Sequence, residues 1–382
     1  MAVVYAITIL ILVAASSKSA SGCFDSIISF GDSLADTGNL LLLSPSSNPP
    51  PSGCPPYGQT FFHRPTGRFS DGRLIIDFIA ESLGLPFVEP YFAGKPAAEK
   101  GGRFSKGVNF AVAGATALGN GFLNKRGIHN RFTNVSLETQ LHWFKQFVAT
   151  IPDVRNYLKS SLVLMGEIGG NDYNYAIMQR RTGEGVPSLI LTVVNNIGFT
   201  IEELIKLGAT TILVPGDLPL GCLPIYLKMF KSYSTDKDYD PKTGCLKWLN
   251  KLSRFHNKLL QKELGRLREL HPHITIIYAN YYNAAMHFYL SPHQFGFTKG
   301  SVLRACYERG SPSNFNTSKP CGISPEVCCD NLSSFASWDG IHYREAACKW
   351  IAQGLLQGPY TNPRISTICP LFPWGVDGYY EY

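Results

Sequence analysis

The chain has 382 residues, of which 45% are hydrophobic and only 16% charged, and its formal net charge is +7. This length is enough for a large buried core and even for two average domains. The basic residues are dispersed, and the sequence contains no zinc-finger spacing and no phosphate-binding glycine loop, so we expect no nucleic-acid partner, no metal ion and no cofactor.

The first 22 residues are predicted to be a secretory signal peptide. An apolar run at residues 3–15 is too short to span a bilayer comfortably, and small residues follow it up to Gly22. We find no second stretch that is long and apolar enough for a transmembrane helix. The sequence therefore predicts a protein of the secretory pathway without a transmembrane anchor, located in the apoplast or extracellular space, with the vacuole as the alternative.

A serine stands at the end of the first predicted strand. Residues 26–30 form a short apolar run, and Gly31-Asp32-Ser33-Leu34 follows directly. This pattern predicts a strand that enters a tight turn with a serine at its tip. A nucleophile has to be held rigidly while its hydroxyl stays accessible, so Ser33 is a candidate nucleophile.

Strands and helices are predicted to alternate along the rest of the chain. A proline-rich irregular loop is expected at residues 44–58. Further short apolar runs, read as buried parallel strands, lie at residues 108–112, 161–165, 210–214 and 274–278. Helical periodicity is found at residues 74–83, 141–148, 189–207, 246–270 and 346–356. This alternation predicts an α/β fold with a parallel sheet that is covered by helices on both faces.

Polar motifs follow several of these strands. Asn109 to Gly114 lies in the second apolar run, and Gly169-Gly170-Asn171-Asp172 follows the third. Near the C-terminus, Asp339-Gly340-Ile341-His342 places a carboxylate and an imidazole three positions apart. Together with Ser33 these residues supply the nucleophile, the base and the orienting acid of a hydrolytic triad. With the nucleophile near the start and its base near the end, residues 23–382 are predicted to form a single domain.

The chain resembles the GDSL, or SGNH, family of serine esterases and lipases, and its plant branch in particular. Four blocks match in order, at residues 31–34, 109–114, 169–172 and 339–342. Segments typical of the plant branch lie at residues 56–58, 64–73 and 219–224. The resemblance implies a flavodoxin-like α/β/α sandwich with about five parallel strands. It also implies a catalytic triad of Ser33, Asp339 and His342, with an oxyanion hole formed by the backbone N–H groups of Ser33 and Gly114 and the side-chain amide of Asn171.

Each of these residues also has a structural interpretation. Asn171 is suited to cap a helix, and Gly114 to permit a tight turn. Asp32, Asp36 and Asp172 are expected to hold loop backbones or helix caps rather than to act as catalytic acids. Tyr173 and Tyr175, close after Asn171, are the best candidates for lining the substrate pocket.

The cysteines and the sequons agree with secretion. All ten cysteines lie at or after residue 23, and their even number predicts several disulfides, although the sequence does not fix the connectivity. Cys321 could close a small loop with Cys328 or Cys329. Asn134, Asn316 and Asn331 stand in N-glycosylation sequons.

The sequence therefore predicts a secreted hydrolase of carboxylic esters that acts through an acyl-serine intermediate on a small-molecule ester. The favoured substrate is a short-chain acyl or acetyl ester of a small plant metabolite, because the insertions are rich in proline, glycine and aromatic residues, as suits a walled pocket. The alternatives are an acyltransferase with the same triad, a lipase for longer acyl chains, a cell-wall polysaccharide deacetylase and, in a different class, a non-catalytic glycan-binding glycoprotein. The oligomeric state is not predicted.

Overall fold

A six-stranded sheet runs through the centre of the computed structural model, which describes residues 23–94, 104–180, 185–306, 329 and 331–370. The strand order is β2-β1-β3-β4-β5-β6; the first five strands are parallel, and β6 runs antiparallel to β5. The strands are β1 (Ser26–Ser29), β2 (Gly107–Asn109), β3 (Ser161–Leu164), β4 (Thr211–Pro215), β5 (Thr275–Ala279) and β6 (Thr361–Asn362).

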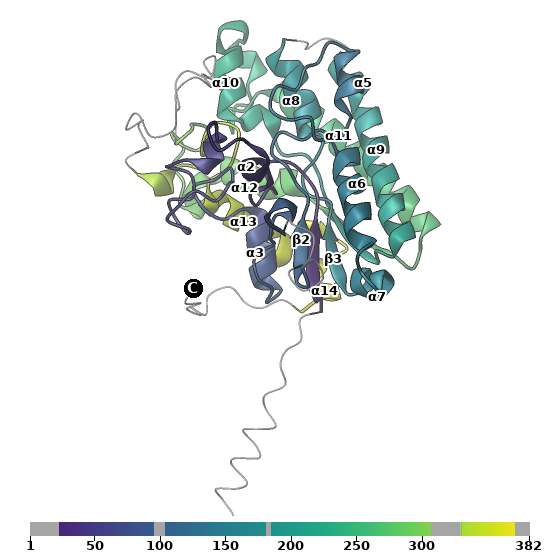
Figure 1. Ribbon diagram of the computed structural model, residues 1–382. Helices are drawn as coiled ribbons and strands as arrows, with labels where there is room; N and C mark the ends of the chain where they lie inside the picture. The colour runs from purple at the N-terminus through teal and green to yellow at the C-terminus, as the bar shows by residue number, and fades with distance from the viewer. Residues whose placement is uncertain (1–22, 95–103, 181–184, 307–328, 330, 371–382) are drawn as a thin grey trace, which may run out of the picture.

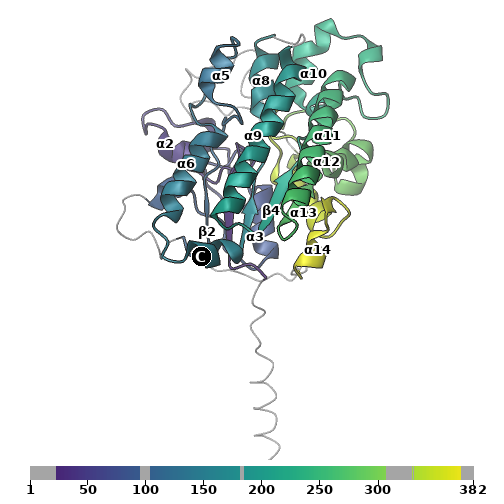
Figure 2. The same ribbon diagram turned by 90° about the vertical axis from the view of Figure 1, so that its right-hand side faces the viewer.

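Long helices cover both faces of this sheet. One face is covered by α6 (Leu137–Val148), α9 (Gly185–Leu207) and α11 (Lys247–Leu270), which Figure 2 shows in front of the strands. The other face is covered by α3 (Ile75–Ser82), α12 (Tyr281–Leu290) and α13 (Glu345–Leu356). Successive strand residues point to opposite faces, so Ile28 belongs to the first core and Ile27 to the second. The three-layer α/β/α fold expected from the sequence is confirmed.

Shorter helices gather mainly where the chain leaves the strands. The loops after β1, β3 and β4 lead into α2 (Asn39–Leu43), α8 (Gly170–Met178) and α10 (Pro224–Phe230); in Figure 1 α8 and α10 lie at the upper end of the molecule and α2 lies below them. The others are α5 (Asn120–Asn124), α7 (Val154–Lys159) and α14 (Ile365–Ile368). Because all five parallel strands point the same way, their polar loops are brought to one edge of the sheet.

The five expected strands are present, with two differences from the sequence prediction. The run at residues 108–112 is in strand conformation only over Gly107–Asn109. Beyond it the chain still follows β1, since the N–H of Phe110 donates to Ser29 O and the N–H of Val112 to Gly31 O. The sixth strand, of two residues, was not predicted; it is too short to have a recognisable pattern.

The expectation that no further segment resembles a membrane span needs correction. In the described chain, Val186–Leu207 is long and apolar enough to cross a membrane, although half of that span is buried in the protein. Its buried side chains include Leu189, Val193, Ile197 and Ile201, which recur at helical spacing and face the core of the domain. Packing against α11, α8 and α6 therefore accounts for the apolar character of this buried face.

The described chain contains three complete disulfides, which confirms the prediction of several. They join Cys23 to Cys369, Cys222 to Cys245 and Cys306 to Cys329. The suggested pair of Cys321 with Cys329 is therefore wrong, because Cys329 is bonded to a residue 23 positions before it. Cys321 and Cys328 lie outside the described residues. Cys54 is also disulfide-bonded, whereas Cys348 is buried and unpaired.

Removing the Cys222–Cys245 bridge should destabilise the domain. The bond closes a loop of 23 residues, and the double variant Cys222→Ala/Cys245→Ala should lose about 3 kcal/mol of unfolding free energy because the unfolded chain gains conformational freedom. Urea unfolding followed by circular dichroism measures the loss. Cys348→Ala, which removes a buried thiol without breaking a bond, serves as the control and should cost less. Equal losses in the two variants would contradict the role of the bridge.

Candidate active site

The side chains of Ser33, His342 and Asp339 lie in one hydrogen-bonded row. Ser33 Oγ is 2.8 Å from His342 Nε2, and His342 Nδ1 is 2.6 Å from Asp339 Oδ2. Ser33 and His342 are 309 positions apart in the chain. In the folded protein, 7% of the surface of Ser33 and 8% of the surface of His342 are exposed to solvent. The imidazole thus connects the hydroxyl to the carboxylate in the order that general-base catalysis requires.

Asp339 is held as a carboxylate by its hydrogen bonds. Its Oδ1 accepts the backbone N–H groups of Ile341 and His342 at 3.1 and 2.8 Å. Burial alone would raise the pKa of Asp339, but the facing imidazole and these N–H donors outweigh burial and keep its pKa below the ordinary value. The group therefore remains an acceptor for Nδ1–H.

The turn that carries Ser33 is clamped from α6 and from the loop after β3. The N–H of Gly31 donates to Gln140 Oε1 at 2.9 Å, and Gln140 Nε2 donates back to Gly31 O at 2.8 Å. Gly31 has a φ of +134°, and a Cβ there would come within 3.0 Å of Glu167 O, so glycine is required at this position. The N–H of Asp32 donates to the same carbonyl of Glu167.

The segment that carries His342 is fixed by buried ion pairs with residues 64–73, one of the sequence blocks. Arg344 Nε and Nη2 donate to Asp71 Oδ2 at 2.9 and 2.5 Å, and the N–H of Glu345 donates to Asp71 Oδ1. Glu345 in turn pairs with Arg73. Because Arg344 and Asp71 are both buried, loss of either partner would leave an uncompensated charge next to the imidazole segment.

The two backbone N–H groups expected in an oxyanion hole are available. In the described chain, neither the N–H of Ser33 nor that of Gly114 donates to another protein atom. Gly114 has a φ of +81°, and its carbonyl accepts from Tyr175 Oη at 2.8 Å and from Asn130 Nδ2 at 3.0 Å. These two bonds fix the peptide plane of the turn in which Gly114 lies.

Asn171 lies in the first turn of α8, and its amide is already engaged. Asn171 Nδ2 donates to Asp32 Oδ2 and to Ala115 O, each at 3.0 Å. Both amide hydrogens therefore have protein acceptors, and a contact with an oxyanion requires one of these bonds to be shared or given up. Burial and the nearby Glu167 carboxylate raise the pKa of Asp32 well above its ordinary value, which favours the protonated acid and weakens this acceptor.

Asp36 and Asp172 hold loop backbones, as the structural interpretation of the sequence expected. Asp36 accepts the N–H groups of Gly38, Asn39, Leu40 and Ala113. Asp172 accepts those of Ala117 and Leu118. Burial raises the pKa of Asp172 to about 7 in spite of these donors. Neither carboxylate reaches the imidazole.

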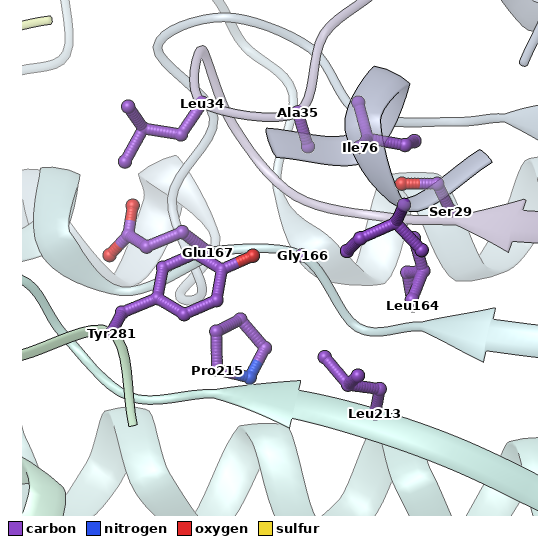
Figure 3. A pocket seen from close by; sticks show the side chains of 11 residues that line it. Ser29, Leu34, Ala35, Ile76, Leu164, Gly166, Glu167, Leu213, Pro215 and Tyr281 are labelled. Atoms are coloured by element: carbon purple, nitrogen blue, oxygen red, sulfur yellow. The ribbon is translucent and has the colours of Figure 1, made fainter. Parts of the chain in front are cut away.

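A small cavity of about 10 Å³ lies beneath the loop that carries Ser33. Figure 3 shows it between the ends of the central strands, with Glu167, Tyr281 and Pro215 on one side and Leu34 across from them. This volume suits about one water molecule. The cavity is therefore too small to hold an ester substrate.

Tyr173 does not lie where the sequence analysis placed it. The helical period of α8 turns its side chain into the core, where it is fully buried and its hydroxyl lies 2.8 Å from His256 Nδ1. Tyr175 does lie at the site, but its hydroxyl supports Gly114, and its ring stacks on the half-exposed Phe132 at 6.0 Å. Phe132 thus places an exposed aromatic ring beside the turn that carries Gly114.

Several site residues were not found from the sequence. Gln140 belongs to a helical stripe and carries no motif, and Asp71 and Tyr57 were seen only as parts of matching blocks. Tyr57 Oη donates to Asp339 Oδ2 at 2.9 Å. Two of the sequon asparagines, Asn134 and Asn331, are exposed, and Asn316 lies outside the described residues.

Comparison with known proteins places the chain in one family. The sequence profile of the GDSL-like lipase/acylhydrolase family matches residues 27–355. A GDSL esterase/lipase of Arabidopsis thaliana is 48% identical over 371 residues, which cover 96% of this chain and 92% of that protein. A second Arabidopsis GDSL esterase/lipase is 51% identical over 350 residues, 91% of this chain and 88% of the relative. A sinapine esterase of Brassica napus is 47% identical over 363 residues, 94% of this chain and 92% of the relative.

The fold and this similarity define an α/β hydrolytic enzyme that acts on carboxylic esters. The chain belongs to the plant GDSL esterase/lipase family, since both the family profile and the relatives cover most of its length.

His256 should make stability depend on pH. Burial lowers the pKa of this histidine to about 4, whereas an unfolded histidine titrates near 6.5. Between these values the unfolded state binds the extra proton, so unfolding free energy is lost as the pH falls from about 6.5 to about 4. Relative to His256→Gln, the wild-type protein should lose about 3 kcal/mol between pH 7 and pH 4, measured by urea unfolding. A constant difference between the two proteins over this range would contradict the assignment.

Proposed function

We propose that Ser33 is the nucleophile of a two-step ester hydrolysis and that His342 and Asp339 activate it. The serine oxygen attacks the ester carbonyl while His342 Nε2 takes its proton, and the imidazolium then protonates the leaving alcohol. In the second step His342 takes a proton from water, the resulting hydroxide attacks the acyl carbonyl, and Ser33 regains its proton as the acid leaves. Asp339 holds the tautomer with Nδ1–H and stabilises the imidazolium.

The tetrahedral intermediate needs donors for its oxyanion. We assign these to the N–H groups of Ser33 and Gly114, which have no protein acceptor in the described chain, and to the amide of Asn171. Each donor of this kind contributes roughly 3 kcal/mol to transition-state stabilisation. To reach the oxyanion, the Asn171 amide would give up its hydrogen bond to Asp32. The raised pKa of Asp32 favours its protonated form, which is a weaker acceptor, so this hydrogen bond is easier to give up.

One observation carries the proposal: Ser33 Oγ, His342 Nε2 and Nδ1, and Asp339 Oδ2 are connected at 2.8 and 2.6 Å by segments from opposite ends of the chain. Glycan binding does not require a serine, a histidine and an aspartate connected in this order. The row is also supported separately on each side, by Gln140 at the turn and by Asp71 at the imidazole segment.

The favoured substrate is a short-chain acyl or acetyl ester of a small plant metabolite. Ser33 and His342 are more than nine-tenths buried, and such burial suits a compact acyl group. The exposed ring of Phe132 lies beside the oxyanion turn and offers an apolar surface for the rest of the molecule. One relative is named a sinapine esterase, which is consistent with a small-molecule substrate.

The site of action proposed is the secretory pathway, with the apoplast as the destination. The disulfides are of the kind that form in oxidising compartments. The exposed positions of Asn134 and Asn331 leave both sequons accessible to glycosylation.

Ser33→Ala should abolish ester hydrolysis, with a loss of roughly 10⁴-fold or more in kcat, because a triad nucleophile cannot be replaced by its neighbours. His342→Ala should lose comparably. The measurement is hydrolysis of p-nitrophenyl acetate, together with fluorophosphonate labelling of the wild type and mapping of the labelled peptide. Ser234→Ala, in a surface loop, is the control and should keep full activity. A label on another serine, or more than a tenth of the activity in Ser33→Ala, would place the nucleophile elsewhere.

Acyl-chain length should separate the proposed substrate class from a lipase. On a series of p-nitrophenyl esters, kcat/KM should be highest for acetyl and butyryl and fall for decanoyl and palmitoyl, because the burial of Ser33 and His342 favours a compact acyl group. Addition of a competing alcohol, with product analysis, tests for acyl transfer. A rate that climbs to palmitoyl, with activation at an emulsion surface, would instead identify a lipase.

A further inference from the structure

The catalytic-site carboxylate has a second partner that neither the mechanism nor the family comparison uses. Tyr57 lies in the proline-rich loop at residues 44–58, far in sequence from the nucleophile turn and from the imidazole segment. Its hydroxyl donates to Asp339 Oδ2 at 2.9 Å, across 282 positions of the chain. This is the same oxygen that accepts from His342 Nδ1 at 2.6 Å.

The donors around Asp339 are divided between its two oxygens. Oδ1 accepts two N–H groups of its own loop, from Ile341 and His342. Oδ2 accepts from the imidazole and, in the described chain, from Tyr57 as its one donor outside that loop. The torsion that turns a carboxylate about its Cβ–Cγ bond is soft, so a donor from a separate segment adds a further restraint to those that the loop provides.

Tyr57 is itself held rigidly enough to act as a fixed donor. Only 5% of its surface is exposed, and its ring packs edge-on against Trp338 at 5.6 Å and Phe69 at 5.9 Å. Phe69 in turn lies against the imidazole of His342 at 4.8 Å. One aromatic cluster thus contacts both members of the Asp339–His342 pair.

The backbone on either side of Tyr57 is equally constrained. Its N–H donates to Cys54 O, and Cys54 is covalently fixed in a disulfide. The N–H of Gly58 donates to Ser70 O. Gly58 has a φ of +76°, and a Cβ at this position would come within 2.1 Å of Arg64 O, so the tight turn after Tyr57 requires glycine.

We propose that Tyr57 is a positioning residue for the active site: its hydroxyl fixes the Asp339 carboxylate in the orientation that receives His342 Nδ1–H. This inference rests on the proposed function, in which His342 is the general base. Without the hydroxyl, the carboxylate keeps its charge and its two backbone donors, but Oδ2 is freer to turn away from the imidazole. Tyr57 touches neither the ester nor the serine and acts through Asp339 alone.

Tyr57→Phe removes only the hydroxyl and keeps the ring in its cluster. We expect kcat on p-nitrophenyl acetate to fall roughly 10- to 150-fold, the effect of losing one hydrogen bond to a charged group, with KM and the melting temperature nearly unchanged. Tyr289→Phe is the matched control, because it removes another buried hydroxyl, one that lies 3.3 Å from Tyr343 Oη and outside the site. It should leave kcat unchanged.

A double-mutant cycle separates positioning from packing. In an Asp339→Ala background the carboxylate is absent, so Tyr57→Phe should change the residual kcat by less than about 2-fold. An equal loss in both backgrounds would show that the hydroxyl acts through packing and would overturn the proposal. Unchanged kcat in the single variant Tyr57→Phe would overturn it as well.

A measurement without substrate distinguishes failure of this inference from failure of the proposed function. The proton between His342 Nδ1 and Asp339 Oδ2 should give a low-field NMR resonance, which Tyr57→Phe should shift and Tyr289→Phe should not. Wild-type protein that hydrolyses no ester refutes the proposed function, whereas the shift still supports the positioning of the pair. A resonance that is identical in wild type and Tyr57→Phe refutes the role of Tyr57.

Discussion

The site depends on a buried junction between the loops that leave β1 and β2. Asp36 accepts N–H groups from its own loop and from Ala113 in the other. Asn39 donates to Asn109 O and Ala111 O, and Asn109 donates back to Ala35 O. With these reciprocal bonds, the turn of the serine and the turn of Gly114 form one rigid unit. Because the groups are buried, breaking one bond leaves a polar atom without water, which makes the junction hard to deform.

The strength of the sequence prediction for the fold came from periodicity. Central strands such as Ser161–Leu164 are continuously apolar, and α11 has a long amphipathic stripe, so both were placed within a residue or two. The prediction failed where tertiary context decides. Residues 110–112 keep two backbone hydrogen bonds to the β1 segment, but the assigned strand conformation ends at Asn109, and β6 exists only because it pairs with the end of β5.

For the candidate site, too, local sequence patterns were informative and tertiary contacts were not predictable. Local motifs contain Ser33, Asp339 and His342, whose side chains the structure brings together, because strand ends meet at one edge of the sheet. They could not show Gln140, whose polar side chain stands in an otherwise ordinary helix, or the inward turn of Tyr173, which depends on the rotation of α8. Contacts between segments that are distant in the chain produce no recognisable sequence pattern in either segment.

The distance of 309 positions between Ser33 and His342 has a consequence for how the protein comes into being. At roughly 5–20 residues per second, a ribosome needs about 15–60 s to travel from one to the other. During that interval the nascent chain carries a serine hydroxyl with no imidazole beside it. A polypeptide released before residue 342 lacks this imidazole altogether, so under the proposed mechanism no incomplete product of translation has a complete triad.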